Sequence, residues 1–306
     1  MNPEYQNLFF VYLIGLSTII SITLATYYIS YNSKLIIREK YTSLILLFSI
    51  IFYVISILYL TFGKINALHQ YTDFATHLEI LWKNSQGLGL KSLMSSKAHG
   101  GSHWFAAHFT PIIYLTYVPG FALLQNAYAI PIFETLFITS SLIPLWLLSK
   151  RYLDRGLSKL FLCCFLFYPT IFYTNLYGIS YIELSIPLLL WLFYFFEKKN
   201  NTLYIVFLIL CLMTREEVSL VTCFFGIYIL ILKRYFLGIF TIAISLIYFF
   251  TVILVVMPFF SENLHITTIH YQNLGSSYSE ILSTVLLNPI ETIIKAVSLP
   301  KIGNLV

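Results

Sequence analysis

The stretch TSLILLFSIIFYVISILYLTF, from Thr42 to Phe62, contains no charged residue and is long enough to cross a membrane as one helix. About 20 consecutive apolar residues are sufficient for a helix to span the hydrocarbon of a bilayer. The whole chain shares this character, because 58% of its residues are hydrophobic and only 10% are charged, whereas soluble domains are about 25% charged. The sequence therefore predicts an all-α integral membrane protein rather than a soluble domain with one anchor.

Further apolar runs predict a polytopic transmembrane helix bundle with about eight spans in total. The first run has no basic residue ahead of it, as a cleaved secretory signal would, so it is interpreted as a permanent anchor. Besides Thr42–Phe62, the predicted spans are Phe9–Tyr31, Tyr128–Leu148, Leu157–Tyr173, Tyr181–Phe196, Thr202–Met213, Val218–Leu232 and Tyr235–Met257.

Basic residues gather in the short loops that the positive-inside rule places in the cytoplasm. These loops carry Lys34, Arg38 and Lys40; Lys150, Arg151, Arg155 and Lys159; Lys198 and Lys199; and Lys233 and Arg234. All of them reach the same side only if Pro111–Leu124, a short apolar run with two prolines, does not cross but lies in the outer leaflet. The net charge of +5 follows from these loops and does not indicate a nucleic-acid partner.

This topology divides the chain into four regions and places it as a multi-pass protein of the cell membrane, inner or plasma. Residues 1–62 hold the N-terminal transmembrane helices, and 63–127 form an outer loop with amphipathic juxtamembrane or re-entrant helices. Residues 128–257 form the transmembrane bundle. Residues 258–306 form an outer segment that either ends here or continues into further helices of a longer protein.

The same topology places most of the remaining polar residues on the outer side of the membrane and predicts one functional site that opens to that side. They are Asp73, Glu79, His99, His103, His108, Asn175, Glu183, Arg215, Glu216, Glu217, Glu262, His265 and His270. The stretch that opens the outer loop predicts an amphipathic helix, with Phe74, Leu78, Leu81 and Trp82 on one stripe and Asp73, Thr76 and His77 on another side. Thr76 and Glu79 have the spacing of a capping box, and Gly87 and Gly89 are expected to end the helix.

An ordered series of short motifs carries a family resemblance. It runs through Ile80-Leu81-Trp82-Lys83-Asn84, His108-Phe109-Thr110-Pro111, Leu147-Leu148-Ser149-Lys150-Arg151, Tyr168-Pro169, Thr214-Arg215-Glu216-Glu217-Val218 and Val255-Val256-Met257-Pro258. From roughly Lys64 to Leu287 the chain resembles the DUF2079 family of predicted membrane proteins. That family in turn is similar to the C-type membrane glycosyltransferases (GT-C), which take sugars from polyprenyl-phosphate carriers. The family pattern has a histidine near Ser180-Tyr181-Ile182-Glu183, and this chain has none there.

The resemblance implies a GT-C-like fold, a polyprenyl-phosphate-linked sugar donor, membrane lipid as surroundings and an acceptor of unknown kind. It also places Asp73 where C-type enzymes carry the catalytic carboxylate, after a transmembrane helix in the first long outer loop. Such a carboxylate accepts the proton of the acceptor hydroxyl. Asp73 could share a divalent cation in this role, and the alternative is a solvated or helix-capping acid.

Five further residues are candidates for substrate binding. Arg215 is either a phosphate clamp, because guanidinium pairs bidentately with phosphate, or part of a solvated hairpin tip. Glu216 and Glu217 either orient Arg215 and assist a metal or lie in that tip. Glu183 either faces a cavity or partner or reaches the outer headgroups. His108 contacts a phosphate or caps the next helix.

The other histidines and the other functions remain open alternatives. Gly100-Gly101 breaks any helical His pair between His99 and His103, so a zinc site is disfavoured against surface-loop histidines. A transporter or flippase would place polar residues near the membrane midplane and show inverted repeats, and no repeat is visible. A non-catalytic membrane protein fragment is the third hypothesis.

Overall fold

A computed structural model describes residues 39–69, 72–93 and 102–261, with a few single positions between 275 and 292. The predicted span Phe9–Tyr31 lies outside the described residues, as do Lys34, Arg38, His99, Glu262, His265 and His270. Within the described part the elements are helical, and extended pairing is limited to one isolated bridge between Lys91 and His103. The prediction of an all-α protein is confirmed for this part of the chain.

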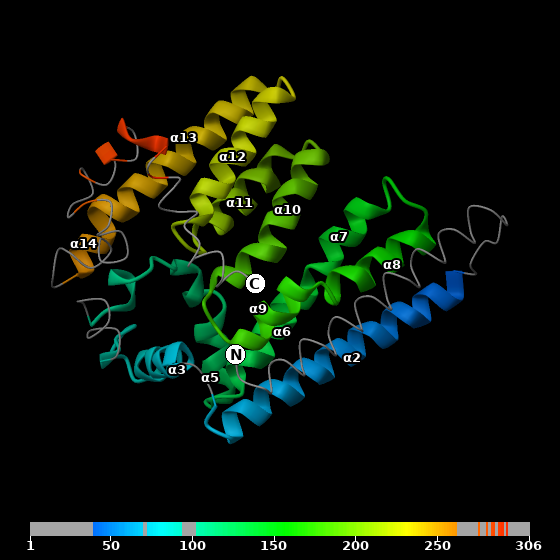
Figure 1. Ribbon diagram of the computed structural model, residues 1–306, viewed down its shortest axis with the longest axis horizontal. Coiled ribbons are helices and arrows are strands. Elements are labelled where there is room, and N and C mark those ends of the chain that lie inside the picture. Colours follow the sequence, from blue (N-terminus) through cyan, green and yellow to red (C-terminus); the bar gives the residue numbers. More distant parts are fainter. Residues whose placement is uncertain are drawn as a thin grey trace.

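The helices follow one another with short connections (Figure 1). They are α2 (Glu39–Asn66), α3 (Thr72–Ser85), η1 (Trp104–Ala106), η2 (Pro111–Tyr114), α5 (Tyr117–Leu124), α6 (Ala129–Ser140), α7 (Leu142–Ser149), α8 (Arg155–Leu166), α9 (Pro169–Tyr177), η3 (Ile182–Leu184), α10 (Ser185–Glu197), α11 (Asn201–Leu212), α12 (Val218–Ile231), α13 (Tyr235–Thr251), η4 (Val252–Val256) and α14 (Met257–Phe260).

Three segments of the described chain are long and apolar enough to cross a membrane: Tyr41–Asn66, Ala129–Ser149 and Tyr235–Phe260. A fourth exists if α8 and α9 count as one span, but these two helices are bent by 44° where Pro169 begins α9. Proline cannot continue the helical hydrogen-bond ladder, which explains the break. The described residues therefore support three or four candidate spans and do not establish the predicted eight.

The difference in span number has a simple physical cause. The predicted spans Thr202–Met213 and Val218–Leu232 form α11 and α12, which have 12 and 14 residues, and α10 has 13. At 1.5 Å per residue such helices extend only about 20 Å, whereas the bilayer hydrocarbon is about 30 Å thick. The run Pro111–Leu124 is also short, as predicted, and divides into η2 and α5.

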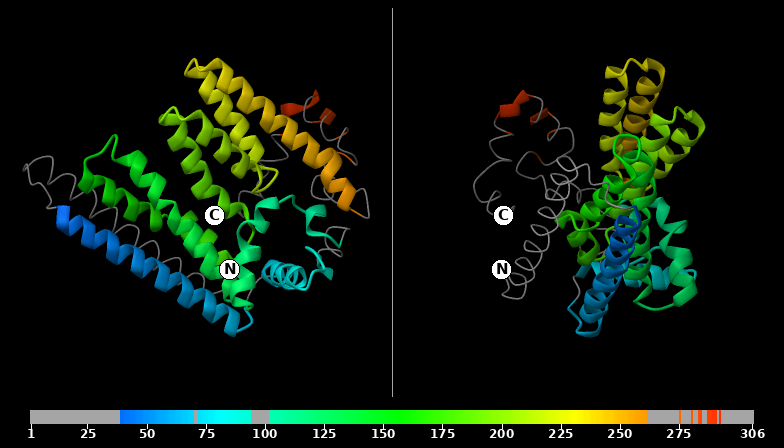
Figure 2. Two further views of the ribbon diagram at one scale, coloured as in Figure 1. Left: turned by 180° about the vertical axis from the view of Figure 1, so that it is seen from behind. Right: turned by 90° about the vertical axis from the view of Figure 1, so that its right-hand side faces the viewer.

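The connections that carry basic residues lie together at one end of the molecule. Figure 1 shows the α7–α8, α10–α11 and α12–α13 connections on the side opposite α3 and α5, and the view from behind in Figure 2 agrees. Seen edge-on, the described helices form a flat layer (Figure 2). This arrangement agrees with the predicted sorting of basic residues; which membrane face they meet stays a prediction.

Three apolar clusters hold the layer together. One joins α2 with α7, α8 and α9, and another joins α10 to α13. The third packs α3, η1, η2, α5 and α6 around Trp104, Tyr117 and Tyr181. This third cluster supports the end of the molecule at which most of the candidate functional residues are found.

Two glycines allow α12 and α13 to approach each other closely. A Cβ atom at Gly226 would lie 2.7 Å from Ile242 Cγ1 and 3.1 Å from the Gly238 carbonyl oxygen. Beside this crossing, the Thr222 and Ser245 hydroxyls are 2.8 Å apart. Small residues commonly mediate helix contacts in membrane proteins, and here backbone atoms occupy the space that a side chain would need.

We therefore expect Gly226→Ala to lower the free energy of unfolding by about 1–3 kcal/mol, the usual cost of overpacking. Thermal unfolding of the purified protein in detergent measures this effect. Gly63→Ala is the matched control, because a Cβ at Gly63 would meet no atom within 4 Å. Equal melting temperatures for the two variants would contradict a tight α12–α13 contact.

Candidate functional site

Helix α3 carries Asp73 in its first turn, with the side chain exposed and Oδ2 accepting a hydrogen bond from the Tyr177 hydroxyl at 2.9 Å. Tyr177 ends α9, so this contact ties the start of α3 to the end of a bundle helix. An acid in the first turn is favoured by the helix dipole. Among the described residues no hydrogen bond or ion pair joins Asp73 to the other predicted site residues.

Parts of the predicted pattern of α3 are wrong. The helix buries Thr76 and His77 and leaves Trp82 half exposed, the reverse of the expected stripes for these residues. The capping box is also wrong, because α3 begins at Thr72 and Glu79 accepts from Lys83 and Ser92, each at 2.6 Å. The surrounding apolar cluster buries both faces of α3 near His77. Amphipathic periodicity alone therefore could not predict which residues of α3 are buried. The expected end of α3 before Gly87 is confirmed.

His77 is the residue by which α3 reaches the interior. It is 2% exposed, and its ring lies edge-on to Trp104 at 4.6 Å and to Tyr181 at 4.5 Å between ring centroids. Burial, followed by the charges of His108 and Arg215, lowers the pKa of His77 to about 3. His77 is therefore neutral at physiological pH. It lies one turn after Asp73, so both residues share one side of α3.

Trp104 connects His77 to the centre of the site. Its indole Nε1 donates a hydrogen bond to Thr110 Oγ1 at 2.9 Å, and its ring lies 5.6 Å from that of His108. His103 accepts from the Phe105 amide at the start of η1 and stacks on Phe260. His103 is thus a structural residue rather than the surface-loop histidine that was expected.

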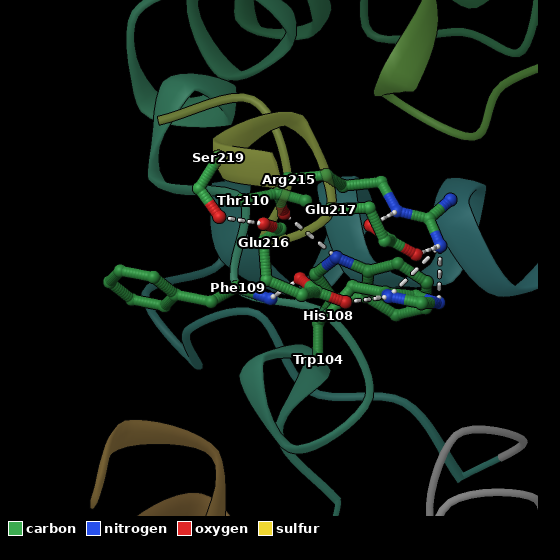
Figure 3. A network of polar contacts seen from close by, with 8 residues as sticks. All are labelled: Trp104, His108, Phe109, Thr110, Arg215, Glu216, Glu217 and Ser219. Carbon is green, nitrogen blue, oxygen red and sulfur yellow. Dashed lines mark hydrogen bonds and ion pairs between the residues drawn. The ribbon is translucent and has the colours of Figure 1, made fainter. Parts of the chain in front are cut away.

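His108 and Glu216 form the core of the site, although they are far apart in sequence (Figure 3). His108 Nδ1 lies 2.6 Å from Glu216 Oε1, and the Phe109 amide donates to Glu216 Oε2 at 3.0 Å. Because a carboxylate only accepts, the Nδ1 atom carries the proton. Burial would raise the pKa of Glu216, but the hydrogen bond and charge of His108 outweigh it and hold that pKa below 4.5.

Arg215 is held beside this pair by Glu217. Its Nε and Nη2 atoms donate to the two Glu217 oxygens at 2.9 and 2.7 Å, a bidentate pair (Figure 3). Nη2 lies 3.0 Å from His108 Nε2 and 3.1 Å from Nδ1. Because Arg215 Nη2 is almost equidistant from both ring nitrogens, it lies over the imidazole ring of His108 rather than along the lone pair of one nitrogen. Arginine side chains often stack on planar rings in this way.

The cluster can be tested as a metal site. Ligand atoms of His108, Glu216 and Glu217 lie within 4.8 Å of one another, a spacing that would suit an ion. However, Arg215 already supplies positive charge to Glu217, and Glu216 is engaged by His108 and Phe109. A metal would have to displace Arg215 from this network. The geometry therefore fits an anion-binding cation better than a metal centre, since guanidinium matches phosphate or carboxylate oxygens.

Glu183 lies in η3, just before α10 and outside the candidate spans. The Ser180 amide and hydroxyl donate to its Oε1 at 3.0 and 2.8 Å, and the carboxyl is buried at 2% exposure. Burial raises the pKa of Glu183 to about 7, although Arg215 acts in the opposite direction. Glu183 therefore faces the protein interior, and the alternative of reaching lipid headgroups is wrong in this structure.

The structure thus brings together His108, Arg215, Glu216 and Glu217, with Glu183 within electrostatic reach of Arg215. Glu216 does not lie in a solvated hairpin tip, because its side chain is only 7% exposed. That alternative partly describes Glu217, whose side chain is 47% exposed. His108 does not cap the following helix, because its side chain is engaged by Glu216 and Arg215. Trp104 and His77 were not predicted as neighbours of the site, although the four-residue spacing of Asp73 and His77 was an available signal.

A family model described as a predicted membrane protein (DUF2079) matches residues 67–306, most of the chain. The chain belongs to the DUF2079 family. The match confirms the resemblance to the DUF2079 family and includes every residue of the site, while α2 lies wholly ahead of the matched region. No curated protein and no solved structure matches the chain. Membrane association is thereby supported for this DUF2079 protein.

Proposed function

We propose that the protein is a multi-pass glycosyltransferase of the C type in the cell membrane, using a polyprenyl-phosphate-linked sugar as donor. The observation that carries this proposal is the Arg215–His108 pair, a fixed cation beside an imidazole. Arg215 lies in the α11–α12 connection, at the other ends of α11 and α12 from the basic α10–α11 and α12–α13 connections. Both side chains remain partly accessible, at 15% and 27% exposure. A partly accessible guanidinium next to apolar helices suits a phosphate whose lipid tail stays in the bilayer.

The proposed reaction assigns one task to each side chain. Asp73 takes the proton from the acceptor hydroxyl, whose oxygen attacks the anomeric carbon of the sugar. The bond from that carbon to the phosphate oxygen breaks, and the polyprenyl phosphate leaves. Arg215 stabilises the charge on the leaving phosphate, and Glu217 keeps the guanidinium in position.

Two neighbouring residues support this arrangement. Protonation of His108 at Nε2 would let it donate to a phosphate oxygen while Nδ1 stays with Glu216. Glu183 helps to hold the Arg215 guanidinium from the buried side of the site, because its charge interacts with that of Arg215.

Binding of polyprenyl phosphate tests the anion site directly. We expect Arg215→Ala to weaken binding to the purified protein about tenfold to a hundredfold, the value of hydrogen bonds to charged groups. Quenching of tryptophan fluorescence can follow binding, because Trp104 lies against His108. Arg151→Ala, at the basic end and paired with Glu197 at 3.4 Å, is the matched control. Equal loss in both variants would mean non-specific attraction and would reject the site.

A transporter or flippase remains the second candidate, and one observation favours it. Glu134 in α6 and Asn175 in α9 are buried polar residues of apolar helices. Asn175 Nδ2 donates a hydrogen bond to the Tyr53 hydroxyl at 3.0 Å. Polar groups inside membrane helices often mark a transport pathway. Movement of a fluorescent polyprenyl-phosphate sugar across liposomes, lost in Glu134→Gln but kept in Asp73→Asn, would favour transport over transfer.

A further inference from the structure

A second group of polar side chains lies deeper than the Arg215 centre, where α5, α6 and η3 meet. Glu134 of α6 and Glu183 of η3 are 1% and 2% exposed, and Tyr117 and Tyr181 are equally buried. Within the described part of the chain, both Glu134 oxygens, Glu183 Oε2 and the two phenol oxygens have no hydrogen-bond partner. Buried polar atoms without partners are rare in native proteins and call for an explanation.

These oxygens belong to one neighbourhood. Glu134 interacts electrostatically with Glu183, and Tyr117 interacts with both carboxyls and with Tyr181. The two tyrosine rings lie 5.3 Å apart, edge to face. Although the groups are this close, no hydrogen bond joins either phenol to either carboxyl among the described residues. Oxygens that bind one cation do not need to hydrogen-bond one another, because each is directed at an ion about 2.3–2.6 Å away.

We propose that Glu134, Glu183, Tyr117 and Tyr181 bind a divalent cation that accepts oxygen ligands, such as Ca²⁺ or Mg²⁺. Carboxylate and neutral oxygens are the ligands that these hard cations prefer. Two carboxylates buried together stay ionised only if positive charge compensates them, and one divalent ion balances both. Ser180 donates to Glu183 Oε1 and so fixes the carboxylate, while Oε2 stays available to the ion.

This site shares Glu183 with the surroundings of Arg215 but takes none of its other ligands from the His108 centre, and it does not depend on the proposed glycosyltransferase activity. Its ligands come from α5, α6 and the segment around η3, whereas the His108 centre combines the residues after η1 with the α11–α12 connection. The ion would join three elements of one apolar cluster. It would therefore stabilise the fold whether or not a sugar is transferred.

Direct binding of the ion alone provides the test. Tb³⁺ replaces Ca²⁺ and luminesces when a nearby tyrosine or tryptophan is excited, and Tyr117 and Tyr181 are suitably placed. We expect the purified protein in detergent to show Tb³⁺ luminescence that Ca²⁺ displaces, and a melting temperature that rises with Ca²⁺ or Mg²⁺ but not with Na⁺ at equal ionic strength. Glu134→Gln and Glu183→Gln should each weaken binding about tenfold or more, since even indirect changes at metal sites cost that much.

Two controls separate this site from other acidic groups. Glu197→Gln, at the basic end, and Glu217→Gln, in the His108 centre, should both keep the wild-type affinity. Tyr181→Phe preserves the ring and removes one ligand, so it should weaken binding while the protein still folds. Unchanged affinity in both glutamine variants at Glu134 and Glu183, a loss confined to Glu217→Gln, or a response to Na⁺ alone would each overturn the proposal.

Discussion

Asp73→Asn is expected to lower sugar transfer from a labelled polyprenyl-phosphate donor by about 10²–10⁴-fold, the usual contribution of a positioned general base. The amide cannot accept the proton of the acceptor hydroxyl. It can still accept the 2.9 Å hydrogen bond from Tyr177, so α3 should keep its position. Transfer in membranes that contain the whole protein, followed over time, measures the change.

Asp154→Asn is the matched control for this experiment. Asp154 caps α8 at the opposite end of the layer, where its side chain accepts from the Gly156 and Leu157 amides. Asparagine is an equally good N-cap, so this variant should transfer at the wild-type rate. Full activity in Asp73→Asn would remove Asp73 from the mechanism. Polyprenyl-phosphate binding that persists without any transfer in the wild type would favour transport.

The membrane character of the chain could be predicted because it depends on local composition. The run Thr42–Phe62 lies within α2, and Tyr235–Met257 lies within the segment that ends at Phe260. The number of spans could not be predicted in the same way. Tyr181 has a left-handed backbone, with φ of 66°, and Pro169 bends the path between α8 and α9. Such breaks divide runs that are continuous in hydropathy.

The site could be predicted only in part. Arg215, Glu216 and Glu217 interrupt an apolar sequence, so their charge was itself the signal. The pairing of Glu216 with His108 depends on a contact across more than a hundred residues, which no local pattern specifies. Glu134 was missed for a different reason: a single carboxyl within an apolar run does not change the assignment of the span.

Glu216→Ala is expected to lower the free energy of unfolding by about 3 kcal/mol, because removing one partner of a buried pair leaves the other unsatisfied. His108 Nδ1 and the Phe109 amide would both lose their acceptor. Glu217→Ala removes a carboxylate that is half exposed and should cost no more than about 1 kcal/mol. Thermal or denaturant unfolding in detergent compares the two variants, and equal losses would show that the His108–Glu216 pair is not the stronger contact.

The same pair should make stability depend on acid. The folded pKa of Glu216 lies below its ordinary value of 4.5, so its carboxylate stabilises the fold fully above pH 4.5 and loses this effect as pH falls through the folded pKa. His77 acts over a window that begins at higher pH and overlaps that of Glu216: its pKa falls from 6.5 to about 3, so the unfolded chain binds a proton first and stability declines between those values. Glu216→Gln should therefore make the profile less steep below pH 4.5 and keep the decline that begins near pH 6.5. His77→Phe should remove that earlier decline and keep the later one. An unchanged profile in both variants would show that other groups govern acid unfolding.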